Sequence, residues 1–236
     1  FISVSAGPQI LTAMAANNMD LCNIGSSAMI VGMAQGLPVS MVWLHKVVKD
    51  SECLVVRTDA GINGLADLKG KKVGCPFNTS VHFAVLAAIT TVGLTASDVT
   101  LVNLRPDALA AAWQRKEIDA AYIWHPVLGN LEKDGGKIIF MTGDLAAKGT
   151  IVFDGIICRD AFKKERPELV LAYLKEIDRI NTIYRDKPDQ VADVMAPFLQ
   201  IPRETVLTIA KTTHTIPAQE MIKPQWMGPP GTKDSG

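Results

Sequence analysis

Two short segments of this chain each lead from an apolar strand into a helix through small and hydroxyl-bearing residues. They are 21–28, with Ser26 and Ser27, and 73–82, with Thr79 and Ser80. The backbone N–H groups at a helix start have no intrahelical acceptor, and the positive end of the helix dipole favours an anion there. Two such starts far apart in the chain predict a small anionic group held from both sides, although each could instead be an ordinary N-cap.

His82 falls on the first turn of the second predicted helix. A helix N-terminus disfavours protonation of an imidazole. The sequence therefore predicts that His82 is a neutral hydrogen-bond donor to a ligand, with a simple capping arrangement as the alternative.

Two acidic residues stand beside apolar strands. Asp154 is the only charge in the stretch 152–158, and a buried carboxylate must find a cation or several donors. Glu52 directly precedes the apolar strand 53–56, although it could also be a solvated loop residue. Trp124 ends another strand, where parallel α/β sheets place their ligands, although a core tryptophan is the alternative.

Composition excludes several function classes. The 236 residues are 48% hydrophobic and 20% charged, which is typical of a globular protein. Lys plus Arg and Asp plus Glu each number 24, so no net charge favours nucleic acid or a membrane surface. The sequence contains no nucleophile elbow, Walker sequence, HExxH or dinucleotide fingerprint. It therefore predicts a protein that is not an enzyme, without catalytic residues or a cofactor.

The four cysteines, at positions 22, 53, 75 and 158, lie singly in strand-like stretches. None forms a CxxC pair or has metal-ligand spacing to a histidine, so no metal site is expected. They are interpreted as buried, reduced thiols, which weighs against an oxidising compartment.

Strand-like and helix-like segments alternate from residue 1 to about 159, as in an α/β fold with largely parallel sheets. The expected strands include 1–5, 39–45, 53–57 and 120–124. Charged amphipathic helices follow over 167–185, 188–199 and 203–211. The order predicts lobe one at 1–73, an inserted lobe two at 74–151, and a helical return to lobe one at 152–236. Crossing strands near 73–76 and 152–157 would be hinges, with a ligand cleft between the lobes.

Over several stretches that include the candidate site residues, the chain resembles the solute-binding proteins of bacterial ABC importers for aliphatic sulfonates and nitrate. The likeness covers about residues 7–214, and the matching stretches are Asn23–Ser27, Ser51–Val56, Pro76–His82, Val102–Pro106, Ala111–Arg115, Ile118–Trp124 and Leu131–Gly135. The resemblance implies a type II periplasmic-binding-protein fold that binds taurine or a related aminosulfonate and delivers it to a membrane permease.

The same resemblance implies a role for each candidate residue. Ser26, Ser27, Thr79, Ser80 and His82 would surround the sulfonate. Glu52 and Asp154 would face the ammonium group, and Trp124 would form a wall along the carbon chain. The expected partners are thus a zwitterionic sulfonate and the permease, with no nucleic acid, and the protein is expected to be a monomer.

Some features depart from the family. An acidic residue commonly precedes the Ser-Gly of the family's first helix, whereas this chain has Ser5-Ala6-Gly7. The family's first strand and helix would precede Phe1, and its closing helices would follow Trp226. The expected location is the periplasm, or outside the cell on a lipid anchor, although no signal peptide is visible.

Two other functions remain open at this stage. The chain could be a ligand-sensing domain without a transport role. It could also be an enzyme like the thiamin-pyrimidine synthases of the same fold. Those enzymes use a cysteine-rich motif, and this chain has no adjacent cysteines.

Overall fold

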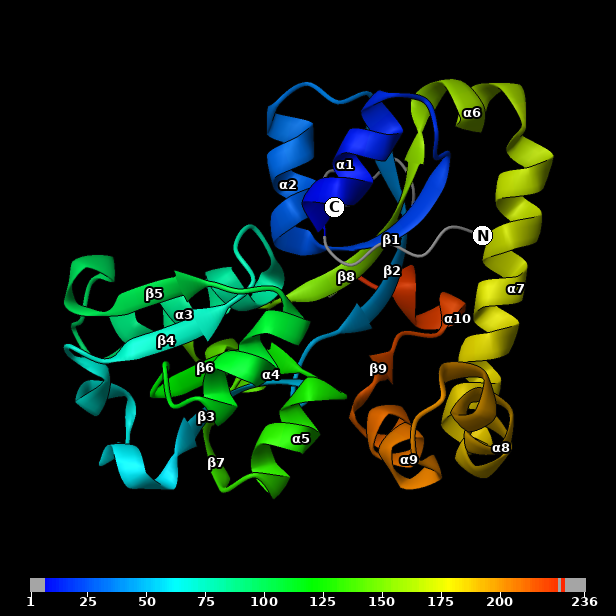
Figure 1. Ribbon diagram of the computed structural model, residues 1–236. Coiled ribbons are helices and arrows are strands. Elements are labelled where there is room, and N and C mark those ends of the chain that lie inside the picture. The colour runs from blue at the N-terminus through cyan, green and yellow to red at the C-terminus, as the bar shows by residue number, and fades with distance from the viewer. Residues whose placement is uncertain (1–6, 225, 228–236) are drawn as a thin grey trace. The chain divides into compact units, whose positions relative to one another are not determined.

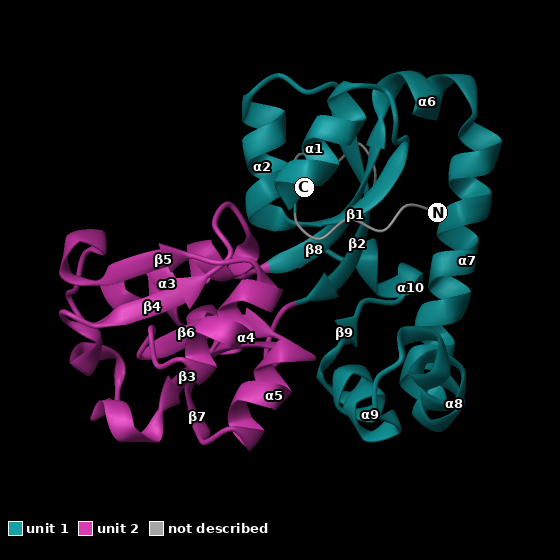
Figure 2. Ribbon diagram, in the orientation of Figure 1, with its two compact units in different colours: residues 1–47, 153–236 teal, residues 48–152 magenta. Residues whose placement is uncertain are grey.

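The computed structural model describes residues 7–224, 226 and 227. These form two compact units, the first from the described residues within 1–47 and 153–236 and the second from residues 48–152 (Figure 2). The strand expected at Phe1–Ser5 and the Ser5-Ala6 departure lie outside the described residues.

The first unit combines a four-stranded sheet with helices from both ends of the chain (Figure 1). Its elements are α1 (Gly7–Ala15), β1 (Leu21–Gly25), α2 (Ser26–Ala34), β2 (Val39–Val47), β8 (Phe153–Arg159), α6 (Asp160–Glu165), α7 (Pro167–Asp186), α8 (Pro188–Leu199), α9 (Arg203–Thr212), β9 (His214–Thr215) and α10 (Ala218–Met221). The strand order is β1-β8-β2-β9. The three charged helices predicted after residue 160 are confirmed as α7, α8 and α9.

The second unit is built on a five-stranded sheet of order β5-β4-β6-β3-β7. Its main elements are β3 (Glu52–Arg57), β4 (Lys72–Cys75), α3 (Ser80–Thr90), β5 (Thr100–Asn103), α4 (Pro106–Gln114), β6 (Ala120–Trp124), α5 (Val127–Lys133) and β7 (Gly136–Met141). Four 3₁₀ segments complete it: η1 (Thr58–Ala60), η2 (Leu65–Leu68), η3 (Ala96–Asp98) and η4 (Thr142–Lys148).

The α/β class with two sheets is confirmed, but the strand directions differ from the prediction. Within the second unit β4 pairs in parallel with β5 and β6, whereas β3 pairs antiparallel with β6 and β7. All described pairs of the first unit are antiparallel. The reason is that β8 returns from the second unit between β1 and β2 and runs opposite to both.

The first division of the chain lies at Val47 and Val48, earlier than the predicted boundary after Val73. The segment 48–73 belongs to the second unit because β3 is hydrogen-bonded between β6 and β7. Leu54, Val55 and Val56 of β3 are completely buried there, which removes large apolar side chains from water. β4 consequently lies inside the second unit and does not cross between units. The return occurs after Val152, one residue beyond the predicted boundary.

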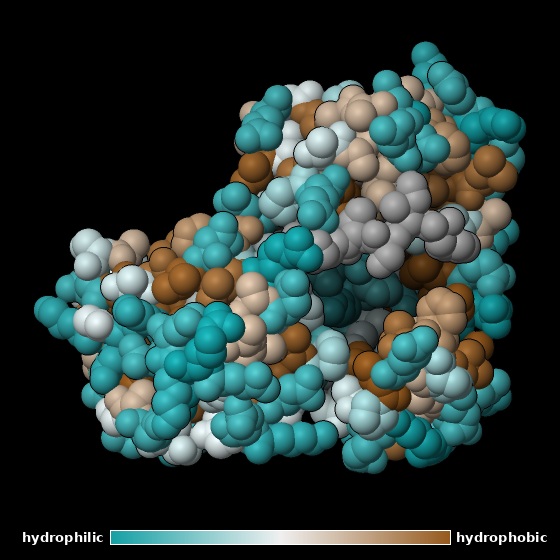
Figure 3. Space-filling view, viewed as in Figure 1, coloured by the Kyte–Doolittle hydropathy of each residue, from teal (hydrophilic) through white to brown (hydrophobic). Residues whose placement is uncertain are grey.

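Three of the four thiols, Cys53, Cys75 and Cys158, are buried, and Cys22 is half-buried. Among the described residues, no helix combines the length and apolar character needed to cross a membrane. Hydrophobic residues on the visible face form separate patches among hydrophilic ones (Figure 3).

Candidate functional site

Three of the predicted residues come together in the second unit. Glu52 is the first residue of β3 and is only 5% exposed. Its Oε1 accepts a hydrogen bond from the Ser80 hydroxyl at 2.8 Å. Glu52 also lies opposite Trp124 in the antiparallel pairing of β3 with β6. Sheet register therefore joins Glu52 to Trp124, and the start of α3 supplies Ser80.

Trp124 is half-buried and packs against both hydrophobic clusters of the second unit. This contact serves the core, as the alternative interpretation of Trp124 requires. The residue nevertheless ends β6 beside the buried carboxylate of Glu52.

The hydroxyl groups at the start of α3 are already used as donors. Thr79 is the N-cap residue, but its side chain makes no capping hydrogen bond. Its hydroxyl instead donates to the Pro76 carbonyl at 2.6 Å, while that of Ser80 donates to Glu52. The donors that a helix start offers to an anion are then the backbone N–H groups of the first turn.

His82 is the third residue of α3 and stacks on Phe77, with ring centroids 4.2 Å apart. Its Nδ1 accepts the Asn78 backbone N–H at 3.4 Å. Burial lowers the pKa of His82, which favours the neutral imidazole; with Nδ1 accepting a hydrogen bond, the proton of that form resides on Nε2. The contribution of Phe77 was missed, although this aromatic residue is part of the Pro76–His82 stretch.

A second set of predicted residues lies in the first unit. Gly25 is the N-cap of α2, so Ser26 and Ser27 are its first two helical residues and not caps. The buried Ser26 hydroxyl accepts the Phe153 backbone N–H at 3.4 Å. Asp154 follows directly and lies opposite Gly25 across β1 and β8. Asp154 is thus paired in the sheet with the residue that immediately precedes α2.

Asp154 has the cation that a buried carboxylate requires. Its Oδ2 lies 3.2 Å from the Lys46 ammonium, and Lys46 faces Asp154 across β2 and β8. Sequence reasoning missed Lys46 because the predicted strand ended at His45, whereas β2 continues to Val47. The available signal was a charge one residue after that predicted end.

His45 occupies a register shift between Leu44 and Lys46. Its Nδ1 is buried without a hydrogen-bond partner. Burial lowers the pKa of His45, and the nearby Asp154 charge opposes this effect.

The predicted residues therefore form two sets, each within one unit. The first unit holds Ser26, Ser27 and Asp154, and the second holds Glu52, Thr79, Ser80, His82 and Trp124. Each set combines a hydroxyl-bearing helix start with a largely buried carboxylate.

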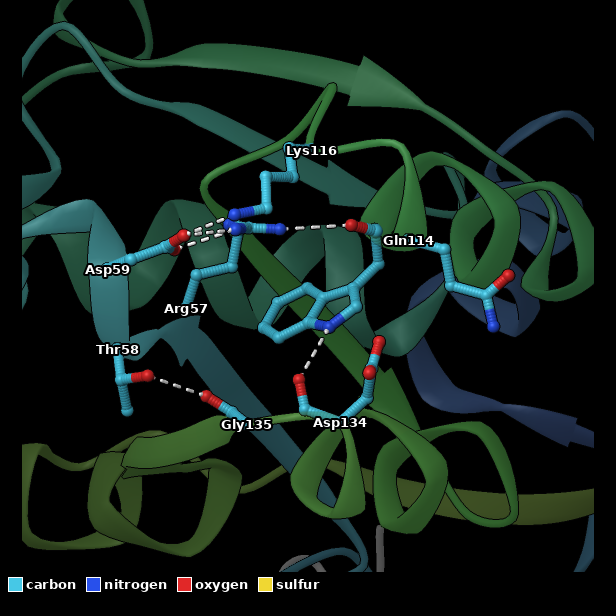
Figure 4. A pocket seen from close by; sticks show the side chains of 8 residues that line it. Arg57, Thr58, Asp59, Gln114, Lys116, Asp134 and Gly135 are labelled. Carbon is cyan, nitrogen blue, oxygen red and sulfur yellow. Dashed lines mark hydrogen bonds and ion pairs between the residues drawn. The ribbon is translucent and has the colours of Figure 1, made fainter.

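A separate pocket of about 250 Å³ lies in the second unit and contains none of these residues (Figure 4). It lies at the Arg57 end of β3, about 17 Å along the strand from Glu52 at about 3.3 Å per residue. Asp59 accepts hydrogen bonds from Lys116 and Arg57, which lower its pKa to about 2. Since its main cations are already paired with Asp59, the pocket presents little unmatched charge.

No cluster of three or more potential metal ligands occurs among residues 7–224, 226 and 227.

The chain is similar to several known proteins. Residues 3–191 match the family model described as NMT1/THI5 like. The chain is 35% identical over 184 residues to the taurine-binding periplasmic protein of Escherichia coli K12. That match covers 78% of this chain but only 57% of the relative's length.

Solved structures share the fold. The alkanesulfonate-binding protein SsuA from Xanthomonas axonopodis pv. citri, bound to MOPS, has a TM-score of 0.82 at 21% identity, over 95% of this chain and 78% of that one. The periplasmic aliphatic sulphonate binding protein SsuA from Escherichia coli has a TM-score of 0.81 at 22% identity, with the same coverage. At these identities the likeness establishes the two-lobed α/β fold.

Proposed function

Because the chain belongs to the NMT1/THI5-like family, we propose that it binds a small sulfonate and delivers it to the membrane permease of an ABC importer. The proposed place of action is the periplasm, as for the similar taurine-binding periplasmic protein. The proposed state is a monomer that performs no chemistry on its solute.

One observation carries the proposal: a hydroxyl-bearing helix start lies beside a largely buried carboxylate in each unit. Ser80 is bonded to Glu52 in one, and the Gly25–Ser26 start of α2 lies beside Asp154 in the other. The backbone N–H donors at a helix start favour an anion that only accepts hydrogen bonds, and carboxylates favour an ammonium group. A small zwitterion has both charges.

The proposed solute is taurine or a related aminosulfonate. We assign the sulfonate to the starts of α2 and α3, with Ser26, Ser27, Thr79, Ser80 and the neutral His82 around it. Since the Thr79 and Ser80 hydroxyls already donate elsewhere, the backbone N–H groups there would carry the hydrogen bonds. Glu52 and Asp154 would bind the ammonium group, and Trp124 would contact the carbon chain.

Titration calorimetry on folded, ligand-free protein tests this function. The panel is taurine, ethanesulfonate, longer alkanesulfonates, sulfate and nitrate. We expect saturable binding of sulfonates, and little heat from sulfate or nitrate, which lack the carbon chain. If no sulfonate binds, the proposed function is wrong.

A further inference from the structure

Lys46 forms an ion pair with Asp154, the residue paired with Gly25 just before α2, and has no part in the function proposed so far. The two charged atoms are 3.2 Å apart, and the Lys46 and Asp154 side chains are 20% and 15% exposed. Leaving one of two largely buried charges without its partner is strongly unfavourable. Separating this pair therefore costs more than separating an exposed ion pair.

The register of three strands defines the neighbours of Asp154. Across β1 it faces Gly25, and across β2 it faces Lys46. Residues that face each other across neighbouring strands lie on one face of the sheet, within side-chain contact. Gly25 has no side chain, so Lys46 supplies the only side chain of these two neighbours.

Gly25 also directly precedes Ser26 and Ser27. On its β1 side, therefore, Asp154 is paired with the N-cap residue of the helix to whose start the sulfonate is assigned. On its β2 side it meets an ammonium group that belongs to the protein. That ammonium is the same chemical group that an aminosulfonate would bring.

We propose that Lys46 is a specificity-determining residue, which occupies Asp154 in place of a solute amine and thereby reduces the advantage of amine-bearing sulfonates. This inference rests on the proposed function, because it assumes that Asp154 belongs to the solute site. An aminosulfonate must displace Lys46 or share one carboxylate with a like charge, which is unfavourable. An alkanesulfonate without an amine meets no such competition, so the solute class extends to amine-free sulfonates.

Taurine and ethanesulfonate provide the test, since they differ only by the amine. The measured quantity is the ratio of the ethanesulfonate Kd to the taurine Kd for each variant. We expect Lys46→Met to raise this ratio by about tenfold, because one removed charge–charge competition is of that size. Lys46→Gln keeps a neutral donor for Asp154 and should shift the ratio in the same direction if the Met variant folds poorly.

Lys163→Met is the matched control, since Lys163 is also in the first unit and pairs with an aspartate, Asp160, at 3.2 Å. It removes the same net charge and should leave the ratio unchanged. Adding Asp154→Asn to Lys46→Met should abolish the gain, because the carboxylate that the amine would reach is gone.

Two negative outcomes are distinguishable. If wild type binds neither sulfonate, the proposed function fails and the role of Lys46 fails with it. If wild type binds both, but folded Lys46 variants shift the ratio no more than Lys163→Met does, or lower it, the proposed function stands and the role of Lys46 is overturned.

Discussion

The Ser80 hydroxyl donates a hydrogen bond to Glu52 Oε1 at 2.8 Å, joining the first residue of α3 to the first residue of β3. The bond connects residues 28 positions apart, both of them more than nine-tenths buried. A hydrogen bond to a carboxylate in such surroundings is stronger than one between neutral groups, so the pair fixes the orientation of Glu52.

Glu52→Gln should weaken taurine binding by about tenfold or more while affecting ethanesulfonate much less. The amide keeps the shape of the side chain and an acceptor for Ser80, but it removes the charge that would attract an ammonium group. Calorimetry with both solutes measures the two losses. Equal losses would show that Glu52 maintains the structure and does not contact the amine.

Asp154→Asn should also weaken taurine far more than ethanesulfonate. The substitution removes the second carboxylate assigned to the amine, and it leaves the Lys46 charge without its 3.2 Å partner. That charge would then repel the taurine ammonium directly. Thermal unfolding of the variant separates a lost contact from a lost fold, and a parallel decline for both solutes would contradict the assignment.

Much of the fold could be predicted from local sequence patterns. The bounds of β6 and α8 agree with the predicted strand 120–124 and helix 188–199, because Pro, Gly and charged residues mark their ends. The assignment of β3 to the first lobe was wrong. Its apolar run fits a buried strand in either sheet, and only its pairing with β6 and β7 decides between them.

In the candidate site, too, local sequence patterns predicted some features, whereas others depend on strand pairing and loop conformation. Asp154 was predicted to need a cation or several donors because it is a lone charge in an apolar strand, and the structure supplies a cation, Lys46. The identity of the cation depended on the register of β2 with β8, including two register shifts. Side-chain pairs such as Ser80 with Glu52, or His82 with Phe77, depend on how a loop folds, which residue types alone do not determine.

The thiols of the native protein should react slowly with a disulfide reagent such as DTNB. Burial raises the pKa of Cys53 and of Cys75 from 9.0 to about 12, and that of Cys22 to about 11. Since the thiolate is the reactive form, each unit of pKa lowers its fraction about tenfold near neutral pH. This would allow the thiols to stay reduced in the proposed periplasmic location. Rapid reaction of several thiols without denaturant would contradict the prediction.

The free energy of unfolding should decrease as the pH falls below about 6.5. In the unfolded chain His45 takes up a proton near its ordinary pKa of 6.5, whereas burial lowers this pKa in the folded protein. The unfolded state then binds more protons, so stability present above pH 6.5 is lost on acidification.

Urea unfolding at pH 7.5 and 5.5 measures this loss. His45→Gln should reduce it without abolishing it, because burial also lowers the pKa of His82 and of His125. An unchanged pH dependence in the variant would contradict the role of His45.

Gly136→Ala should destabilise the second unit by about 1–3 kcal/mol, the usual cost of an overpacked core position. A Cβ at Gly136 would lie 2.6 Å from the Leu131 carbonyl oxygen and 2.6 Å from Val55 Cγ2. The carbonyl belongs to the backbone of α5 and cannot rotate away, so β7 must shift relative to α5. Gly64→Ala is the matched control, because its extended backbone has no atom within 4 Å of the added Cβ. Urea unfolding should show a loss for Gly136→Ala and a change within about 0.5 kcal/mol for Gly64→Ala. Equal stability of the two variants would mean that β7 and α5 pack more loosely than these distances indicate.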